Sequence, residues 1–143
     1  MIFVREPILH PVAIDDLRPT QITVGMRVVE AKRKAWRTKK GDQRAEFIGR
    51  HMIPVILGPR QRHDVIDHHH LIRALRQEGI KNVLVTVVAK LTRLQPDAFW
   101  FVLDNHNWLH PFDDQGRRRS YRNWQTCSVS GQKYIGRYPH RYR

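Results

Sequence analysis

The chain of 143 residues contains a single cysteine, Cys127, so it can form neither an internal disulfide nor a cysteine-based zinc site. It also lacks any run that approaches the roughly 18 apolar residues needed to span a bilayer. Its first eleven residues, MIFVREPILHP, have no basic start and no continuous apolar core, so we do not expect a secretory signal. These absences favour a soluble, cytoplasmic protein without a membrane partner.

Acidic residues are scarce relative to basic ones. The chain has 26 Lys and Arg against 13 Asp and Glu, a formal net charge of +13. Such an excess attracts polyanions and favours nucleic acid as a partner, although a basic surface without a dedicated partner has the same composition. Nine of the basic residues lie between positions 27 and 50. We expect Lys32, Arg33 and Arg37 there to contact nucleic acid.

The last 29 residues, 115–143, have eight basic side chains, no acid and all four tyrosines. Cations interleaved with aromatic rings can hold phosphates and stack on bases, so we also predict that Arg117, Arg118 and Arg119 bind nucleic acid. The same stretch is poor in Leu, Val and Ile, as a loosely ordered extension would be. We therefore divide the chain into a domain at 1–114 and a basic, aromatic-containing extension at 115–143.

Hydrophobic periodicity predicts a mixed α+β domain. Strands are expected at 8–14, 51–57, 62–67 and 82–89, the middle two as a hairpin and the last buried on both faces. Helices are expected at 22–38, 71–78 and 97–105. Residues 15–20 are expected to form a turn with helix-start chemistry, and 39–43 and 58–61 exposed connections. The order predicts short helices packed on a small mixed sheet.

Three consecutive histidines follow Asp67 where a strand gives way to a helix. A helix N-terminus presents unpaired N–H groups, so this turn can seat a phosphate, with the imidazoles as further donors. Two other interpretations remain open: Asp67 caps the helix and the histidines are a polar helix start, or Asp67, His68 and His70 bind a divalent ion. The run lacks the i,i+4 spacing of helical zinc sites, so we assign no metal ligands.

The segment VIDHHHLIRALRQEGI (65–80), followed by KNVLVTVV (81–88), resembles the ParB/sulfiredoxin superfamily. Members have a strand, a DGxHR motif, a short helix ending in glycine and an apolar strand. The segments at 17–22 and 47–57 are similar to earlier parts of the same domain, and the resemblance covers about residues 8–114. The variety to which the chain is most similar is the ParB-like group described as putative nucleases.

The resemblance assigns the motif aspartate to Asp67 and the motif histidine to His70. The chain departs from the motif where His68 replaces its glycine and Leu71 replaces its arginine. His69 stands where sulfiredoxins have their reactive cysteine, so sulfiredoxin chemistry is not expected. In the superfamily this turn binds nucleotide phosphates, which implies ATP, ADP or CTP with Mg²⁺ as candidate cofactors. Phosphate would then be bound by His68, His70 and Arg73.

Three functions follow from this resemblance and the charge. The first is a nuclease in which Asp67 or a neutral His69 is the general base for phosphodiester hydrolysis. The second is a non-catalytic DNA-binding module of the chromosome-partitioning type. The third is a nucleotide-dependent phosphotransferase similar to the serine-kinase relatives, in which Glu30 is the catalytic carboxylate and lies near the Asp67 turn. Outside a catalytic role, Glu30 is expected to be a solvated partner of Lys34.

Overall fold

A computed structural model describes residues 2–3, 11–21, 24–112, 115–118 and 132–133. The described residues form four α-helices: α1 (Met26–Arg37), α2 (Asp42–Arg50), α3 (His69–Gln77) and α4 (Pro96–Asn105). The strands are β1 (Ile2–Phe3), β2 (Pro11–Ala13), β3 (Leu17–Pro19), β4 (Val24–Gly25), β5 (Ile53–Leu57), β6 (His63–Val65), β7 (Asn82–Lys90) and β8 (Gln132–Lys133). Short 3₁₀ turns, η1 (Ile14–Asp16) and η2 (Pro59–Gln61), precede β3 and β6.

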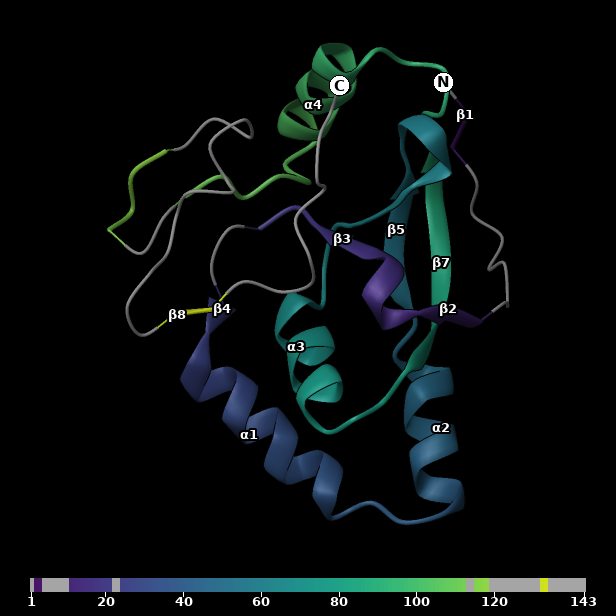
Figure 1. Ribbon diagram of the computed structural model, residues 1–143, viewed down its shortest axis with the longest axis vertical. Coiled ribbons are helices and arrows are strands. Elements are labelled where there is room, and N and C mark those ends of the chain that lie inside the picture. The colour runs from purple at the N-terminus through teal and green to yellow at the C-terminus, as the bar shows by residue number, and fades with distance from the viewer. Residues whose placement is uncertain (1, 4–10, 22–23, 113–114, 119–131, 134–143) are drawn as a thin grey trace.

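The main sheet is mixed and has the order β1-β7-β5-β6-β3 (Figure 1). Strand β7 pairs parallel with β5 and antiparallel with both β1 and β2. Strands β5 and β6 form an antiparallel pair, and β6 is parallel to β3. The carboxyl ends of β3 and β6 therefore lie at the same edge of the sheet. A separate pair joins β4 to β8.

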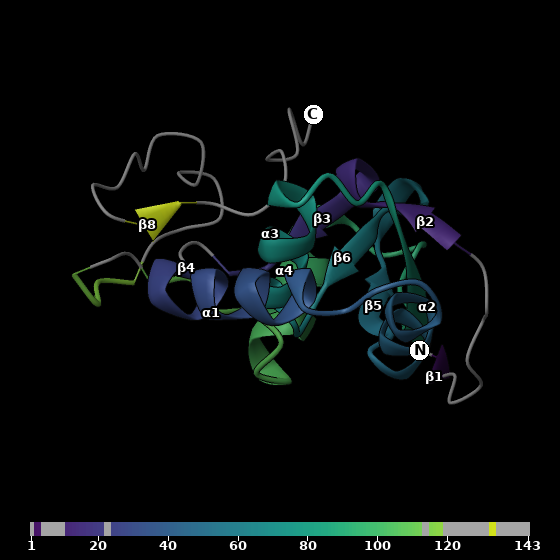
Figure 2. The same ribbon diagram turned by 90° about the horizontal axis from the view of Figure 1, so that it is seen from below.

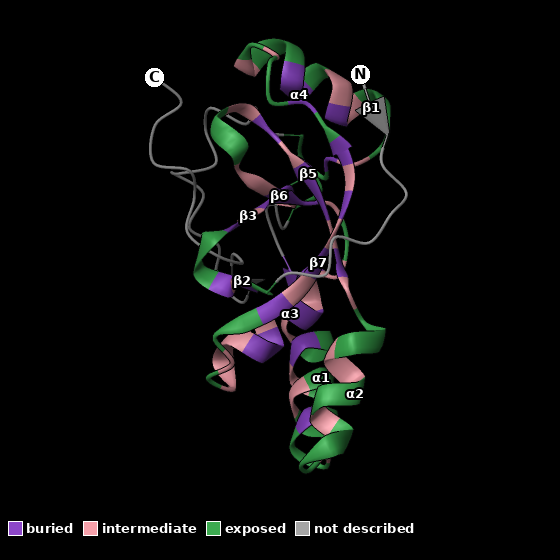
Figure 3. Cartoon of the chain, turned by 90° about the vertical axis from the view of Figure 1, so that its right-hand side faces the viewer, coloured by how far each residue is buried: buried purple, intermediate pink, exposed green. Residues whose placement is uncertain are grey.

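Two apolar clusters hold the helices on the sheet. The larger joins buried side chains of β5, β6 and β7 to Leu71, Ile72 and Leu75 of α3 and to Trp36 of α1. The smaller packs α4, through Phe99, Trp100 and Leu103, against Ile56 and Ala89. Burying a side chain of this size contributes about 1.5–3 kcal/mol, so these contacts dominate the fold. Figure 3 shows the buried residues concentrated on the strands and on one side of α3.

The mixed α+β fold and the β5–β6 hairpin are confirmed. Helix α2 was not predicted, because its partly buried Phe47 and Ile48 make too narrow an apolar stripe to reveal a nine-residue helix. The segment 15–20, expected as a turn with helix-start chemistry, instead contains part of η1 and the strand β3. Strand β3 is too short to show an alternating pattern.

Two further expectations need correction. Helix α1 begins at Met26 rather than at position 22, because Val24 and Gly25 pair with β8. Strand β7 is not fully buried on both faces: residues at alternate positions from Val83 to Ala89 are buried, and those between them are partly exposed. Strand β7 is central because it pairs with three other strands, β1, β2 and β5. Its continuous β-branched sequence is apolar on both faces, and for this reason the sequence predicted burial of both. The division of the chain at 114 stays a prediction, since most of 115–143 lies outside the described residues.

Candidate functional site

The predicted turn lies where the parallel strands β3 and β6 end and two helices begin. Helix α3 begins at His69, directly after the turn that leaves β6. Helix α1 begins one residue after Gly25, whose N–H donates to Nε2 of His70 at 3.2 Å. The carboxyl edge of parallel strands is where open α/β sheets commonly bind ligands. The fold therefore brings the starts of two helices to one place at this edge.

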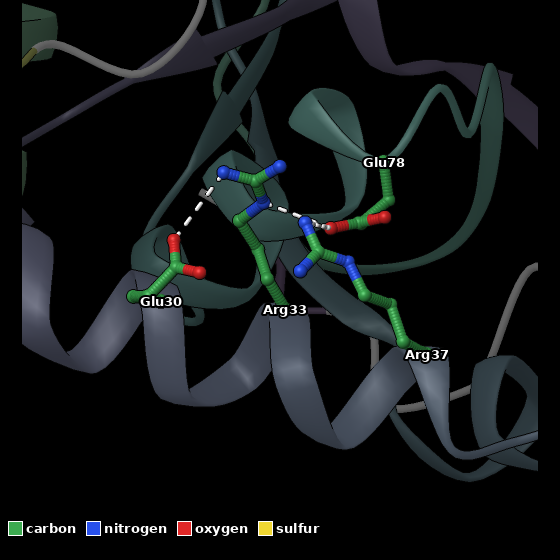
Figure 4. Close-up of polar contacts among 4 residues, drawn as sticks. All are labelled: Glu30, Arg33, Arg37 and Glu78. Atoms are coloured by element: carbon green, nitrogen blue, oxygen red, sulfur yellow. Dashed lines mark hydrogen bonds and ion pairs between the residues drawn. The ribbon is translucent and has the colours of Figure 1, made fainter.

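Helices α1 and α3 pack side by side and run in the same direction (Figures 1 and 2). At the far ends, Glu78, the residue that ends α3, accepts from Arg33 and Arg37 of α1, each at 2.8 Å (Figure 4). Since the N-terminal ends also meet, the positive ends of both helix dipoles point to the turn that contains Asp67. The two arginines lie at the negative ends, where cations are favoured.

The turn itself has an unusual backbone. His68 has φ 62° and ψ 28°, in the left-handed region, and is the residue immediately before α3. The carboxylate Oδ1 of Asp67 accepts from the N–H of His68 at 2.7 Å. Asp67 is therefore not the N-cap, as one interpretation held, but stabilises the residue that occupies that position. Glycine, which stands at this position in the related motif, adopts the left-handed conformation without steric cost. Histidine tolerates this conformation better than most other residues with a side chain.

His69 is buried, with 3% of its surface exposed. Its Nε2 lies 3.4 Å from the N–H and 3.3 Å from the hydroxyl of Thr20, and its ring also bonds the backbone of Val65. The Thr20 hydroxyl donates to the carbonyl of Val65 at 2.5 Å. Burial, and secondarily the neighbouring His110, lowers the pKa of His69 to about 3. The neutral ring connects Thr20, which follows β3, to the turn through hydrogen bonds. This arrangement argues against the role of general base predicted for it.

His70 is half-buried. Burial, and next the ammonium of Lys32, lowers the pKa of its imidazole, and its Nε2 accepts from Gly25. His70 was expected to bind phosphate, and in the structure its Nε2 is engaged by the N–H of Gly25. Both rings instead fix the positions of the two helix starts. Helix α3 begins two residues earlier than predicted, which places both rings inside it.

Several groups at the turn remain suited to an anion. The N–H groups of His69, His70 and Leu71 belong to the first turn of α3, where no intrahelical acceptor exists. Lys32 is exposed on α1 and close enough to His70 to affect its charge. Asp67 is exposed and His68 is partly exposed. Arg73 is half-buried one turn further along α3, and burial lowers the pKa of its guanidinium.

Other predicted residues lie apart from the turn. Glu30 pairs with Arg33 at 3.3 Å, rather than with Lys34, and through Arg33 its contacts lead to the C-terminal end of α3 (Figure 4). Among the hydrogen bonds and ion pairs of the described residues, those of Glu30 join it to Arg33 and not to the Asp67 turn. Arg33 and Arg37 share Glu78, so part of their charge is neutralised within the protein.

The arginines of the C-terminal extension are only partly described. Arg117 is exposed, Arg118 pairs with Asp104 of the segment ending α4, and Arg119 lies outside the described residues. Within the described part of the chain, no three His, Cys, Asp or Glu side chains gather closely enough to hold a metal ion. In that same part, no helix is both long and apolar enough to cross a membrane.

Sequence reasoning did not identify Thr20, Gly25 or Glu78 as parts of this arrangement. Thr20 lies in the segment 17–22 that carries the resemblance, and that resemblance was the available signal. Gly25 and Glu78 had none, because their partners His70 and Arg33 are 45 residues away in each case. Contacts at that separation are decided by the packing of α1 on α3.

Comparisons with known proteins show which family and which solved structure the chain resembles. A family model described as "Putative ParB-like nuclease" matches residues 10–125. The crystal structure of protein Atu1540 from Agrobacterium tumefaciens is 50% identical, with a TM-score of 0.73 over 82% of this chain. The match covers 57% of that protein, so this chain spans little more than half of its length. A comparison with curated proteins gave no match.

Proposed function

Because the chain belongs to the family described as putative ParB-like nucleases, we propose that it binds a nucleic-acid or nucleotide phosphate where α1 and α3 begin, and hydrolyses phosphodiesters there. One observation carries the proposal: two parallel helices direct their N-terminal ends to the carboxyl edge of the parallel strands β3 and β6. Helix N-termini bind anions through free N–H groups and the positive end of the dipole.

The charge around the turn supports a phosphate polyanion. Arg27, Lys32 and Lys34 are exposed on α1, and the described contacts give them no acidic partner. Each cation that neutralises a phosphate releases counterions, so binding should weaken steeply with salt. Lys32 is near enough to the turn to lower the pKa of His70. We therefore assign Lys32 to the bound phosphate and the other cations to neighbouring phosphates.

Asp67 is the residue we assign to the chemistry. Its carboxylate is exposed, and the N–H of His68 fixes Oδ1 at 2.7 Å. As general base it takes a proton from a water whose oxygen forms a bond to phosphorus. The bond from phosphorus to the leaving oxygen breaks, and the resulting alkoxide takes a proton from solvent to become the alcohol. A Mg²⁺ ion carried by the phosphates needs one or two carboxylates, and Asp67 is the exposed candidate.

A non-catalytic DNA-binding module is the second candidate, and the state of His69 favours it. The His69 imidazole is buried and His70 accepts from Gly25. Asp67 is therefore the exposed carboxylate among the residues predicted at this turn. A domain that only holds phosphate would need the helix starts and Lys32 but not Asp67. The phosphotransferase receives less support, because the contacts of Glu30 lead away from the turn.

The experiment is a plasmid-nicking assay with Mg²⁺ or Mn²⁺, with and without chelator, on the wild-type chain and Asp67→Ala. Asp16→Ala is a matched control, since Asp16 is an exposed aspartate on η1. If Asp67 is the base, its loss lowers the rate by about 10²-fold or more, whereas the control is unchanged. Salt-sensitive binding without nicking would establish the module instead. Equal nicking by the wild-type and Asp67→Ala chains would refute the assigned base.

Phosphate binding is tested separately by titration calorimetry with ATP, ADP and CTP, and by salt-dependent binding of a DNA duplex. Lys32→Gln should weaken whichever ligand binds and reduce the salt slope, because one phosphate contact is removed. Lys90→Gln, at an exposed lysine that ends β7, is the control. No binding of any nucleotide or of DNA at low salt would overturn the proposed function.

A further inference from the structure

A pocket lies at the opposite end of α1 from the Asp67 turn, where α1 meets α2. Its volume is about 450 Å³, within the range that accommodates small organic ligands. Its lining includes Lys39, Gln43, Glu46, Phe47, Arg50 and His51. Helix α1 has 12 residues and is therefore about 18 Å long, so this pocket and the turn are separate sites.

Two stacked aromatic rings, those of Phe47 and His51, line the pocket. The imidazole of His51 stacks on Phe47 with ring centroids 4.0 Å apart and 24° between the planes. Nδ1 of His51 lies 2.8 Å from the carbonyl oxygen of Phe47, which holds the ring in this orientation. Phe47 in turn meets the buried Trp36 edge-on, at 5.9 Å. The contacts with Phe47 thus hold the His51 ring in place, although His51 is exposed to solvent.

Cations border this aromatic pair. The ammonium of Lys39 lies 4.7 Å from the centre of the Phe47 ring. Arg50 pairs with Glu46 at 2.6 Å, and both side chains are largely exposed, at 75% and 58%. An exposed ion pair of this kind is worth little, so Arg50 can exchange its partner for a phosphate at small cost. Glu46 and Gln43 add hydrogen-bonding groups beside the rings.

We propose that this pocket binds a nucleoside phosphate unit, with the base stacked on His51 and the phosphate held by Lys39 and Arg50. A ring anchored by an aromatic neighbour and bordered by cations is the arrangement that single-stranded nucleic-acid sites use, since every base has a face for stacking. Glu46 can accept from the amino group of a base. The proposal does not depend on phosphate binding at α3.

The unit has two sources: a free nucleotide, or one residue of a single strand. A strand that also reached the Asp67 turn would have to run the length of α1, about 18 Å. Arg27 and Lys34 are exposed on α1 between the two sites. A mononucleotide and a longer strand therefore distinguish the sources by their affinities.

The direct test is photo-crosslinking of a single-stranded DNA of about ten nucleotides that contains 5-iodouracil, followed by tryptic mapping. We expect the crosslink in peptide 51–60 or 45–50, which trypsin separates after Arg50. His51→Ala should remove it and weaken DNA binding about fivefold or more, as expected for the loss of one base stack. Lys39→Gln should weaken binding and Lys39→Arg should restore it.

His106→Ala is the matched control, because His106 is an exposed imidazole stacked on Trp108 at 4.4 Å and 16°, outside this pocket. It should leave the crosslink and the affinity unchanged. Circular dichroism checks that each variant is folded. A crosslink confined to other peptides, with equal affinity for the wild-type and His51→Ala chains, would overturn the proposal.

Equilibrium dialysis with cytidine and adenosine monophosphates identifies the source. Binding that is lost in His51→Ala supports a free nucleotide, and binding of the DNA strand alone, also lost in that variant, supports a strand. If His51→Ala changes neither, the pocket binds no nucleotide. Asp67→Ala should abolish nicking and leave the crosslink to 51–60 intact, so failure of one proposal is distinguishable from failure of the other.

Discussion

Asp64 is a buried carboxyl whose titration should make stability depend on pH. It lies on β6 opposite Ile56 of β5, and 1% of its surface is exposed. Neither carboxyl oxygen has a hydrogen-bond partner among the described residues. A Cβ added at Gly58 would lie 2.6 Å from Oδ2, which shows how closely the carboxyl is enclosed. Burial raises the pKa of Asp64 to about 8, despite the opposing effect of Arg62 and Arg18.

The direction of the pH dependence of stability follows from which state, folded or unfolded, keeps the proton of Asp64. In the unfolded chain Asp64 loses its proton near pH 3.8, whereas the folded chain keeps it up to about pH 8. Between these values the folded state binds one more proton than the unfolded state, so the free energy of unfolding falls as pH rises. The slope is about 1.4 kcal/mol per pH unit, and it vanishes above the folded pKa.

His69 acts in the opposite direction at lower pH. Its ring titrates near pH 6.5 when unfolded and at about pH 3 when folded, so the free energy of unfolding rises with pH between those values. The contributions of Asp64 and His69 oppose each other over most of this range. Well above pH 6.5 the histidine is neutral in both states, and its opposing contribution fades as that pH is passed, so the aspartate dominates. We therefore expect a loss of about 2 kcal/mol between pH 6.5 and pH 8.

The measurement is urea denaturation of the wild-type chain and Asp64→Asn at several pH values between 6.5 and 8. Asn is close to Asp in shape and carries no titrating proton. The variant should therefore lack the part of the fall in unfolding free energy between pH 6.5 and pH 8 that comes from Asp64. The difference in unfolding free energy between the two chains should change by about 2 kcal/mol across this range, and the contributions of all histidines cancel in it. Parallel pH profiles for the two chains would refute the assignment of a protonated, buried Asp64.

Three smaller changes test the turn and its surroundings. His68→Gly should leave stability unchanged or slightly raised and His68→Val should lower it by about 1–2 kcal/mol, because the position is left-handed; thermal unfolding measures both. Thr20→Val should cost about 1 kcal/mol in urea denaturation, since the hydrogen bond from the hydroxyl to the buried carbonyl of Val65 is lost, whereas Thr92→Val, at an exposed site, should cost little. Glu78→Gln should release its two arginine partners and steepen the salt dependence of DNA binding, by up to about 0.9 in the log–log slope for each new phosphate contact.

The local sequence was sufficient for several parts of the molecule. The β-branched run at 82–89 could be assigned as a strand, and the apolar residues of α3 at Leu71, Ala74 and Leu75 as one face of a helix. The hairpin of β5 and β6 followed from two short apolar runs around Gly58 and Pro59. These features depend on neighbours within about ten residues, where periodicity and turn chemistry are informative.

The charge of the chain and the position of the Asp67 turn were likewise determined by the sequence alone, since both are properties of composition and order. Only the tertiary structure decided what the three histidines do. His69 bonds Thr20, 49 residues away, and His70 bonds Gly25, 45 residues away, so both rings are occupied by partners that no local pattern specifies. Burial then lowers the pKa of both imidazoles, because an imidazolium removed from water is costly.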